Sequence, residues 1–433
     1  VASLAVVNMI FRGDGKNNII EGNCFAKFLE AATNNEDPTA RYVSNQSSNP
    51  PVTKVMMNPP FALKRSDEKE FKFIEQALAQ MQDGGTLFSV LPYGAMVKPG
   101  VYRTWRKEVL LRSNTLLAVV TFPPDVFYPV GVTTVGIFVR KGIPHPPDQP
   151  VLWIRAMNDG LWKSKGKRLP NARVPNELAT VRDLVRAFLS NPHHPVPNVQ
   201  QFQRATPVDF WDNLLELVPE VYLEQATPTE QEITNDIEAS VRNTFAYLVK
   251  INKAIVESRL LARSSRMHPA PHGWQSFVTN ELFTLNRRHF HSIADLAPGP
   301  YLTISRISVD NGLVGYYEMP DKAKVLPAKT ITVSTVTGDS FVQPQPFIAT
   351  DNVVLCTPKA PHAPMRLTSL YFIVAMLNRV KWRYSYGRQC YKSKFAQTEV
   401  VLPTDATGRL DEDYMAAIVE NTPFWPLVRV SHP

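Results

Sequence analysis

Residues 52–62 read Val-Thr-Lys-Val-Met-Met-Asn-Pro-Pro-Phe-Ala, a short apolar run that ends in two consecutive prolines. Proline has a fixed φ and no backbone N–H, so the buried strand expected here must end and leave a rigid turn. The side-chain oxygen of Asn58 and the carbonyl of Pro59 could accept both N–H donors of an exocyclic amine, while Phe61 offers a flat face for stacking. Such a turn suits a flipped-out adenine. Asn and Pro are also ordinary turn residues, so the tetrapeptide alone is equally consistent with a surface turn.

Short apolar runs alternate with helical patterns from residue 18 to residue 140, which predicts an α/β unit. Strands are expected at 19–20, 52–57, 86–91, 116–122 and 133–139, and helices at 68–82 and 102–111. The last two strands resemble an antiparallel pair that closes a sheet. Residues 141–225 are richer in proline and charge, and their cluster of Lys163, Lys165, Lys167 and Arg168 is more typical of a solvated loop than of a phosphate clamp.

A long helix is expected after residue 226. Thr227-Pro228-Thr229-Glu230 combines an N-cap hydroxyl, a proline at the first helical position and an acid at the third. An apolar stripe from Ile233 to Ile255 continues the pattern, long enough for a spacer or for pairing with another helix. Pro269 and Pro271 break it, and the β-rich runs that follow predict a second, mixed α+β domain.

Composition limits the class of protein. A chain of 433 residues is expected to fold as two or three domains, and its net charge of +8 suits a polyanionic partner. Cys24, Cys356 and Cys390 are isolated, so neither a disulfide framework nor a metal site is expected. No apolar run is long enough to span a bilayer, and no signal peptide is recognisable. We therefore expect a soluble, cytoplasmic protein without membrane contact.

Three motifs follow one another in the first half of the chain. Asn58-Pro59-Pro60-Phe61 precedes Gly84-Gly85 with Ser89-Val90-Leu91-Pro92, and Phe122-Pro123-Pro124 leads to Gly131-Val132-Thr133-Thr134. In this order they resemble the catalytic half of the adenine-N6 DNA methyltransferases of type I and type IIG restriction-modification systems. The resemblance implies a partial doubly wound sheet with an antiparallel final strand, S-adenosylmethionine as methyl donor and adenine N6 as acceptor. It also implies that Asn58 and Pro59 accept the amine hydrogens, that Pro60 shapes the turn and that Phe61 stacks on the base.

The chain departs from this family in two places. Family members usually carry an acid where Asn23 stands in Glu21-Gly22-Asn23, so Asn23 is the residue that the resemblance assigns to the base pocket. The glycine-rich turn and the acid that hold the methyl donor are missing, because Gly13-Asp14-Gly15 follows an expected helix and is typical of a helix C-terminus. Cofactor-binding residues are therefore not assigned, and we expect an N-terminally truncated piece of a longer protein.

The second half has a different resemblance. Asn311-Gly312, Phe341-Val342-Gln343-Pro344, Tyr384-Ser385-Tyr386-Gly387-Arg388 and Val401-Leu402-Pro403 resemble target-recognition domains of type I specificity subunits and fused type IIG enzymes. Residues 352–398 contain no Asp or Glu, while basic side chains alternate with aromatic ones. Six of these basic residues are expected to bind DNA: Arg379, Lys381, Arg383, Arg388, Lys392 and Lys394. The alternative is a helix with a solvated basic face and core aromatics.

Together these patterns predict a site-specific DNA adenine-N6 methyltransferase, of class EC 2.1.1.72, fused to its own recognition domain. Its partners would be double-stranded DNA and a restriction or specificity subunit. The alternative is a DNA-binding specificity protein that lacks activity of its own and needs a partner chain. A restriction endonuclease finds no support, because no Pro-Asp pair is followed by an acid-x-Lys in a strand context. The expected organisation is a catalytic domain at 1–170, a connecting region with the long helix at 171–265 and a recognition domain at 266–433.

Overall fold

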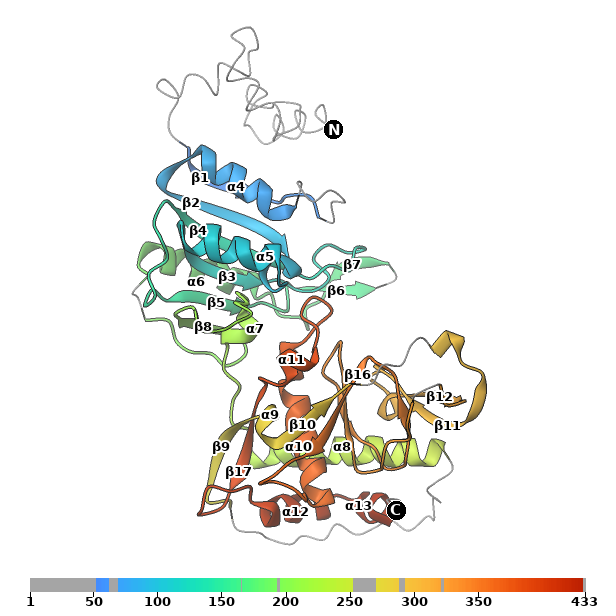
Figure 1. Cartoon of the computed structure of the whole chain (residues 1–433). Helices are drawn as coiled ribbons and strands as arrows, with labels where there is room; N and C mark the ends of the chain where they lie inside the picture. The colour runs from blue at the N-terminus through green and yellow to red at the C-terminus, as the bar shows by residue number, and fades with distance from the viewer. Residues whose placement is uncertain are drawn as a thin grey trace. The chain divides into compact units, whose positions relative to one another are not determined.

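A computed structural model describes residues 52–61, 69–164, 166–192, 195–251, 270–287, 293–320 and 323–430. The chain divides into two compact units (Figure 1). The first unit comprises Val1–Val126, Thr134–Val196 and Ala205–Leu217, and the second comprises Phe127–Thr133, Pro197–Arg204 and Val218–Pro433. The strand expected at 19–20, the Gly-x-Gly of 13–15 and Asn23 lie outside the described residues.

A mixed sheet in the order β1-β2-β4-β3-β5-β8 forms the first unit. Its strands are β1 (Val52–Met57), β2 (Met81–Pro92), β3 (Asn114–Thr121), β4 (Thr134–Lys141), β5 (Val151–Arg155) and β8 (Gln203–Thr206). β1 is parallel to β2 and β3 is parallel to β5, while β4 lies between β2 and β3 and is antiparallel to both. The C-terminal ends of β1, β2, β3 and β5 therefore share one edge of the sheet. The expected α/β fold with an antiparallel strand is confirmed, although β4 lies inside the sheet.

Helices pack on this sheet. They are α4 (Glu70–Gln80), η2 (Tyr93–Met96), α5 (Val101–Trp105), the π-helical η3 (Arg106–Leu111) and α6 (Leu178–Ser190). Phe71 of α4 is buried and stacks on Trp105 with ring centroids 5.5 Å apart. The fully buried guanidinium of Arg106 donates to the carbonyls of Ala95, Leu214 and Leu215 at 2.9, 3.1 and 2.8 Å. Arg106 thus holds the end of the first unit against its helical layer.

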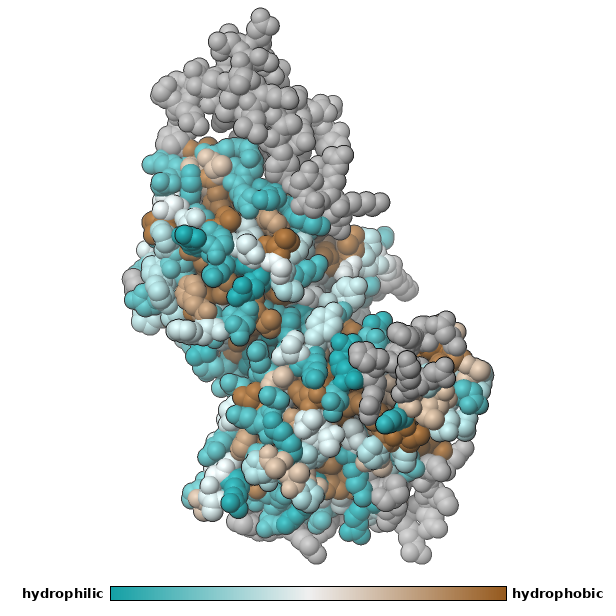
Figure 2. Space-filling view, in the orientation of Figure 1, coloured by the Kyte–Doolittle hydropathy of each residue, from teal (hydrophilic) through white to brown (hydrophobic). Residues whose placement is uncertain are grey.

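The strand expected to be buried at 52–57 is instead exposed, which corrects the sequence prediction. β1 is the edge strand, with Met56 84% exposed and Val52 36% exposed. In Figure 2 apolar side chains reach the surface in the region of β1. The apolar composition indicates a strand with neighbours on both sides, whereas the described residues supply a neighbour, β2, on one side only.

Two long helices form the centre of the second unit. α8 (Glu230–Lys250) packs against α10 (Leu367–Val380), and Ile233, Ile237 and Val241 of its apolar stripe are buried. The helix begins two residues later than the sequence predicts. Its N-cap is Thr229, whose hydroxyl accepts from the Glu232 amide at 3.3 Å while the Glu232 carboxylate accepts from the Thr229 amide at 2.8 Å. This capping box replaces the one expected at Thr227.

Small sheets surround these helices, in the orders β10-β16-β13-β14, β12-β11-β15 and β17-β9. Neighbouring strands are antiparallel except for β15, which is parallel to β11. The strands are β9 (Gly273–Val278), β10 (Phe283–Asn286), β11 (Pro298–Ile304), β12 (Leu313–Tyr317), β13 (Ile331–Ser334), β14 (Ser340–Val342), β15 (Ile348–Ala349), β16 (Val353–Pro358) and β17 (Glu399–Thr404). Short helices connect and cover them: α7 (Pro219–Tyr222), α9 (Thr279–Leu282), η4 (Ile293–Asp295), η5 (Asp310–Gly312), η6 (Lys381–Arg383), α11 (Lys392–Phe395), α12 (Glu412–Glu420) and α13 (Trp425–Val430). This confirms the expected mixed domain.

Candidate functional site

The turn of residues 58–61 leaves the sheet at the shared C-terminal edge. Met57 pairs with Ser89, and β2 continues past this level to Pro92. Pro59 is buried, whereas Asn58 is exposed and Phe61 is half-buried. A buried proline anchors the turn, because its ring is packed and its φ is fixed. The amide of Asn58 therefore stands accessible at the end of a rigid strand.

Three phenylalanines form an apolar surface on one face of this sheet. Phe88 lies opposite Phe138, with ring centroids 4.7 Å apart. A Cβ atom added to Gly136 would come within 2.8 Å of the Phe88 ring and 2.9 Å of the Phe122 ring, so these two rings lie over this glycine. Each remains half-buried. Neither Phe88 nor Phe138 belongs to a predicted motif, and their shared face follows from the pairing of β2 with β4, which alternation along one strand does not reveal.

Carboxylates at this edge are already paired. In the described loops that follow β1, β2, β3 and β5, the acidic residues are Asp125 and Asp159. Arg168 contacts both, at 3.3 and 2.7 Å, and only 13% of its side chain is exposed. S-adenosylmethionine carries ribose hydroxyls and an ammonium group that require acceptors. The described residues at this edge therefore do not by themselves fit that cofactor. Nor does the described part of the chain hold three or more His, Cys, Asp or Glu side chains arranged for a metal ion.

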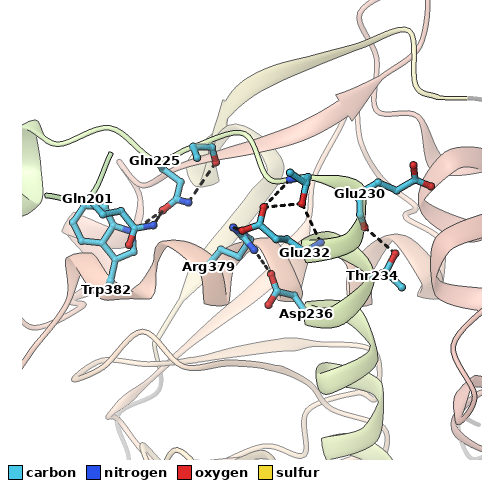
Figure 3. Close-up of polar contacts among 10 residues, drawn as sticks. Gln201, Gln225, Glu230, Glu232, Thr234, Asp236, Arg379 and Trp382 are labelled. Carbon is cyan, nitrogen blue, oxygen red and sulfur yellow. Dashed lines mark hydrogen bonds and ion pairs between the residues drawn. The ribbon is translucent and has the colours of Figure 1, made fainter. Parts of the chain in front are cut away.

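Internal partners in the second unit are present for these residues expected to bind DNA: Arg379, Lys381, Arg383 and Arg388. Arg379, at the end of α10, pairs with Asp236 at 2.5 Å and with Glu232 at 3.3 Å, and 17% of its side chain is exposed. Figure 3 shows its guanidinium directed at these two carboxylates of α8. The charge of Arg379 is thus neutralised inside the unit.

Lys381 lies near a nearly buried acid. Its ammonium is 2.6 Å from Asp339, whose side chain is 9% exposed. Burial opposes ionisation of Asp339, but hydrogen bonds from Lys381, Ser308 and Thr337 outweigh it and lower the pKa of this carboxyl. Lys381 itself remains 46% exposed, so its ammonium is accessible from solvent.

Arg383 and its neighbour Trp382 fasten the segment before α8. Arg383 donates to the carbonyls of Glu220 and Leu223 at 2.7 and 2.9 Å, and burial lowers its pKa. Trp382 donates to Gln225 at 2.7 Å, which Figure 3 also shows. Arg388 donates to the Arg383 carbonyl at 2.9 Å. These contacts hold the loop in one conformation and leave fewer donors for a ligand.

The solvent-facing part of the basic segment lies further along. Lys392 is exposed and Lys394 is half-buried on α11. Tyr386 is 81% exposed and Tyr391 is 46% exposed, so cationic and aromatic groups occur together at this surface. Composition alone does not distinguish these exposed residues from the internally paired Arg379 and Arg383, because it does not reveal the direction of a side chain.

Two motifs of the second resemblance meet in the structure. Gln343 donates to the carbonyl of Asn311 at 2.8 Å and to the hydroxyl of Thr332 at 2.7 Å, and Asn311 donates to the Val342 carbonyl at 3.2 Å. Asn311 and Gln343 are buried. Their side chains therefore stabilise the core and do not face a ligand.

Family models match both units. Residues 1–195 match the model described as N-6 DNA Methylase, and residues 271–422 match the model described as Type I restriction modification DNA specificity domain. The chain thus joins an N6 DNA methyltransferase domain of restriction-modification systems to a DNA specificity domain.

Several individual proteins are similar to parts of the chain. The chain is 32% identical over 162 residues to the type II restriction enzyme and methyltransferase RM.BcgI of Heyndrickxia coagulans, covering 36% of the chain and 23% of that protein. It is 22% identical over 142 residues to the specificity subunit S.BcgI of the same organism, covering 33% and 41%. A type I methyltransferase subunit from Streptococcus thermophilus shares 20% identity with a TM-score of 0.37, covering 52% of this chain and 46% of that one. The chain therefore spans less than half of each relative.

Among the segments that the structure describes, no helix has both the length and the apolar character needed to cross a bilayer. Cys356 and Cys390 are both buried free thiols, and burial raises the pKa of each.

Proposed function

We propose that this chain forms part of a site-specific DNA methyltransferase that transfers a methyl group from S-adenosylmethionine to the N6 amine of a flipped adenine. The observation that carries the proposal is the accessible Asn58 amide next to the buried Pro59, at the strand edge of an N-6 DNA methylase domain. The described residues at this sheet edge do not by themselves fit the cofactor, and the turn would act on the base.

Positioning of the amine is the expected contribution of this turn. The lone pair of an aromatic amine is delocalised into the ring, which makes the nitrogen a poor nucleophile. If Asn58 Oδ1 and the Pro59 carbonyl each accept one N–H, the nitrogen is favoured in a pyramidal geometry with its lone pair directed away from the ring plane. Phe61 would stack on the base and offset part of the cost of unstacking it from the duplex.

Target selection would belong to the second unit. Tyr386, Tyr391, Lys392 and Lys394 present aromatic and cationic groups to solvent in a specificity domain. Cations position a protein on the phosphate backbone, while sequence is read at base edges. Arg379 and Arg383 are better explained as residues that fasten α8 and the preceding segment.

A second candidate function is a specificity protein that methylates only with a partner chain. The observation that favours it is the pairing of both Asp125 and Asp159 with Arg168, which leaves no free carboxylate for the cofactor in the described loops of this edge. In that case the partner would supply the cofactor site.

Analysis of the reaction product distinguishes these candidates. The complete protein of which this chain is proposed to form part is incubated, without partner chains, with duplex DNA and isotopically labelled S-adenosylmethionine, and the DNA is digested to nucleosides for mass spectrometry. Label in N6-methyldeoxyadenosine is the expected result. Label in a methylated cytosine would contradict the proposal, and DNA binding without label would favour the specificity protein.

A further inference from the structure

A basic hairpin projects from the first unit. It consists of β6 (Leu161–Ser164) and β7 (Lys167–Pro170), which pair antiparallel. Figure 1 shows it extending beyond the end of the sheet toward which the arrow of β2 points. Residues 160–176 contain no acidic residue. They contain five basic residues, which are Lys163, Lys165, Lys167, Arg168 and Arg173.

The base of the hairpin is rigidly built. Glu177 accepts hydrogen bonds from the amides of Met157 and Asn158 at 2.7 and 3.0 Å, and Gly160 donates to the Pro175 carbonyl at 3.1 Å. Arg168 adds its contacts with Asp125 and Asp159. Because an isolated hairpin is marginally stable, these contacts are what keeps the ribbon extended.

Cross-strand pairing separates the two faces of the ribbon. Arg168 lies opposite Lys163, so their side chains share one face of the ribbon. This is the face directed toward Asp125 and Asp159, because Arg168 contacts them. Trp162 lies opposite Leu169, and Lys167 lies opposite Ser164, on the other face. Trp162 is 51% exposed, Leu169 is 45% exposed and Lys167 is exposed. The outward face therefore combines a large aromatic ring with a cation.

The hairpin and the turn at Asn58 lie at the same edge of the sheet. The hairpin follows the C-terminal end of β5, at the sheet edge where Asn58 follows β1. Three strands separate β1 from β5. At about 4.8 Å per strand the two lie about 19 Å apart along the edge. This is the length of about six base pairs at about 3.4 Å each.

We propose that the outward face of the β6–β7 hairpin is a second DNA contact of the first unit, in which Lys167 binds a phosphate and Trp162 packs on a sugar or base beside the duplex segment that carries the target adenine. This inference rests on the proposed function. A two-stranded ribbon fits a DNA groove, and the absence of acid from residues 160–176 favours a polyanion over a protein partner.

Binding of a fluorescent duplex without a target site tests the proposal at several salt concentrations. The native protein is compared with the double variant Trp162→Ala/Lys167→Gln and with the control Arg112→Gln. Arg112 is 77% exposed and precedes β3, so the control removes one charge at the opposite edge of the sheet. We expect the double variant to bind about tenfold more weakly, with a salt slope lower by about one, and the control to bind as the native protein does.

Equal binding by the double variant and the control would overturn the hairpin contact while leaving the proposed function standing. A native protein that fails to bind any duplex would overturn both. A photoreactive benzoylphenylalanine at position 162 gives an independent readout that does not depend on the folding of the double variant. Crosslinks to DNA support the proposal, whereas crosslinks to another protein chain in place of DNA contradict it.

Discussion

Arg379 of α10 and Asp236 of α8 form an ion pair with Nη1 and Oδ2 2.5 Å apart, 143 residues apart in sequence. Glu232 of the same helix completes the pairing at 3.3 Å. An arginine from the segment with no acidic residue is therefore neutralised by a distant helix and fastens α8 to α10.

Substitution of Arg379 by Met should affect stability and leave DNA binding unchanged. Loss of its partly buried, charge-assisted hydrogen bonds is expected to lower the free energy of unfolding by about 1–3 kcal/mol. Urea denaturation measures this change, and Lys392→Met serves as the exposed control with almost no effect. If the variant has native stability but its DNA affinity depends less steeply on salt, Arg379 contacts DNA and does not fasten the helices.

Replacement of Lys392 and Lys394 by Gln should weaken DNA binding and leave stability unchanged. If each contacts a phosphate, the slope of log affinity against log salt should fall by about two, and binding to all DNA sequences should weaken similarly. Arg388→Gln, in contrast, should relax specificity at one position if its remaining donors read a base. Isotherms at several salt concentrations provide the measurement. An unchanged slope would mean that the face of α11 is only solvated.

Sequence patterns predicted the secondary-structure elements of the first unit better than they predicted which elements are neighbours in space. β1, β3 and β4 lie within two residues of their predicted bounds, since local spacing reflects strand geometry. β2 begins at Met81, five residues before its predicted start and inside the predicted helix at 68–82. β5 was not predicted, because its short apolar run of Val151–Arg155 lies within a proline-rich region. The exposure of β1 could not be predicted either, because it depends on which strands are neighbours in space.

Side-chain direction explains the different outcomes at the candidate sites. The turn at Asn58 is local, and the structure places it at a strand end as expected. The partners of Arg379 and Arg383 come from α8 and from residues 220–223, far along the chain. No local pattern encodes such contacts, so charge composition alone could not separate core from surface cations.

His145 should make the first unit sensitive to acid. Its side chain is buried, neither ring nitrogen has a hydrogen-bond partner, and burial lowers its pKa to about 4. The unfolded chain, with an ordinary pKa near about 6.5, then binds a proton that the folded chain does not. Above pH ~6.5 the His145 imidazole is neutral in both states and does not change the free energy of unfolding. As the pH falls from ~6.5 toward ~4, it lowers this free energy by on the order of 2–3 kcal/mol.

The variant His145→Leu isolates this effect from the titration of carboxylates. Thermal unfolding of the native and variant chains is compared at pH 7 and pH 5. We expect the native chain to lose more stability than the variant between these two values. Identical losses would mean that His145 titrates normally in the folded state.

Calorimetry with the purified chain should detect little or no binding of S-adenosylmethionine. The described carboxylates at the sheet edge are paired with Arg168, and the glycine-rich turn expected of this family is missing from the sequence. S-adenosylhomocysteine serves as a second probe and should behave in the same way. Binding of either compound in the micromolar range would show that residues of this chain form a cofactor site by themselves.

The rate of methyl transfer by the complete protein of which this chain is proposed to form part, carrying Asn58→Ala, tests the role of this turn most directly. Loss of one oriented acceptor for the adenine amine should lower the rate by about 10²- to 10³-fold, with DNA affinity close to native. Asn58→Asp retains an acceptor oxygen and should keep more activity than the alanine variant. Methylation by Asn58→Ala at nearly the native rate would contradict the role of this turn in catalysis.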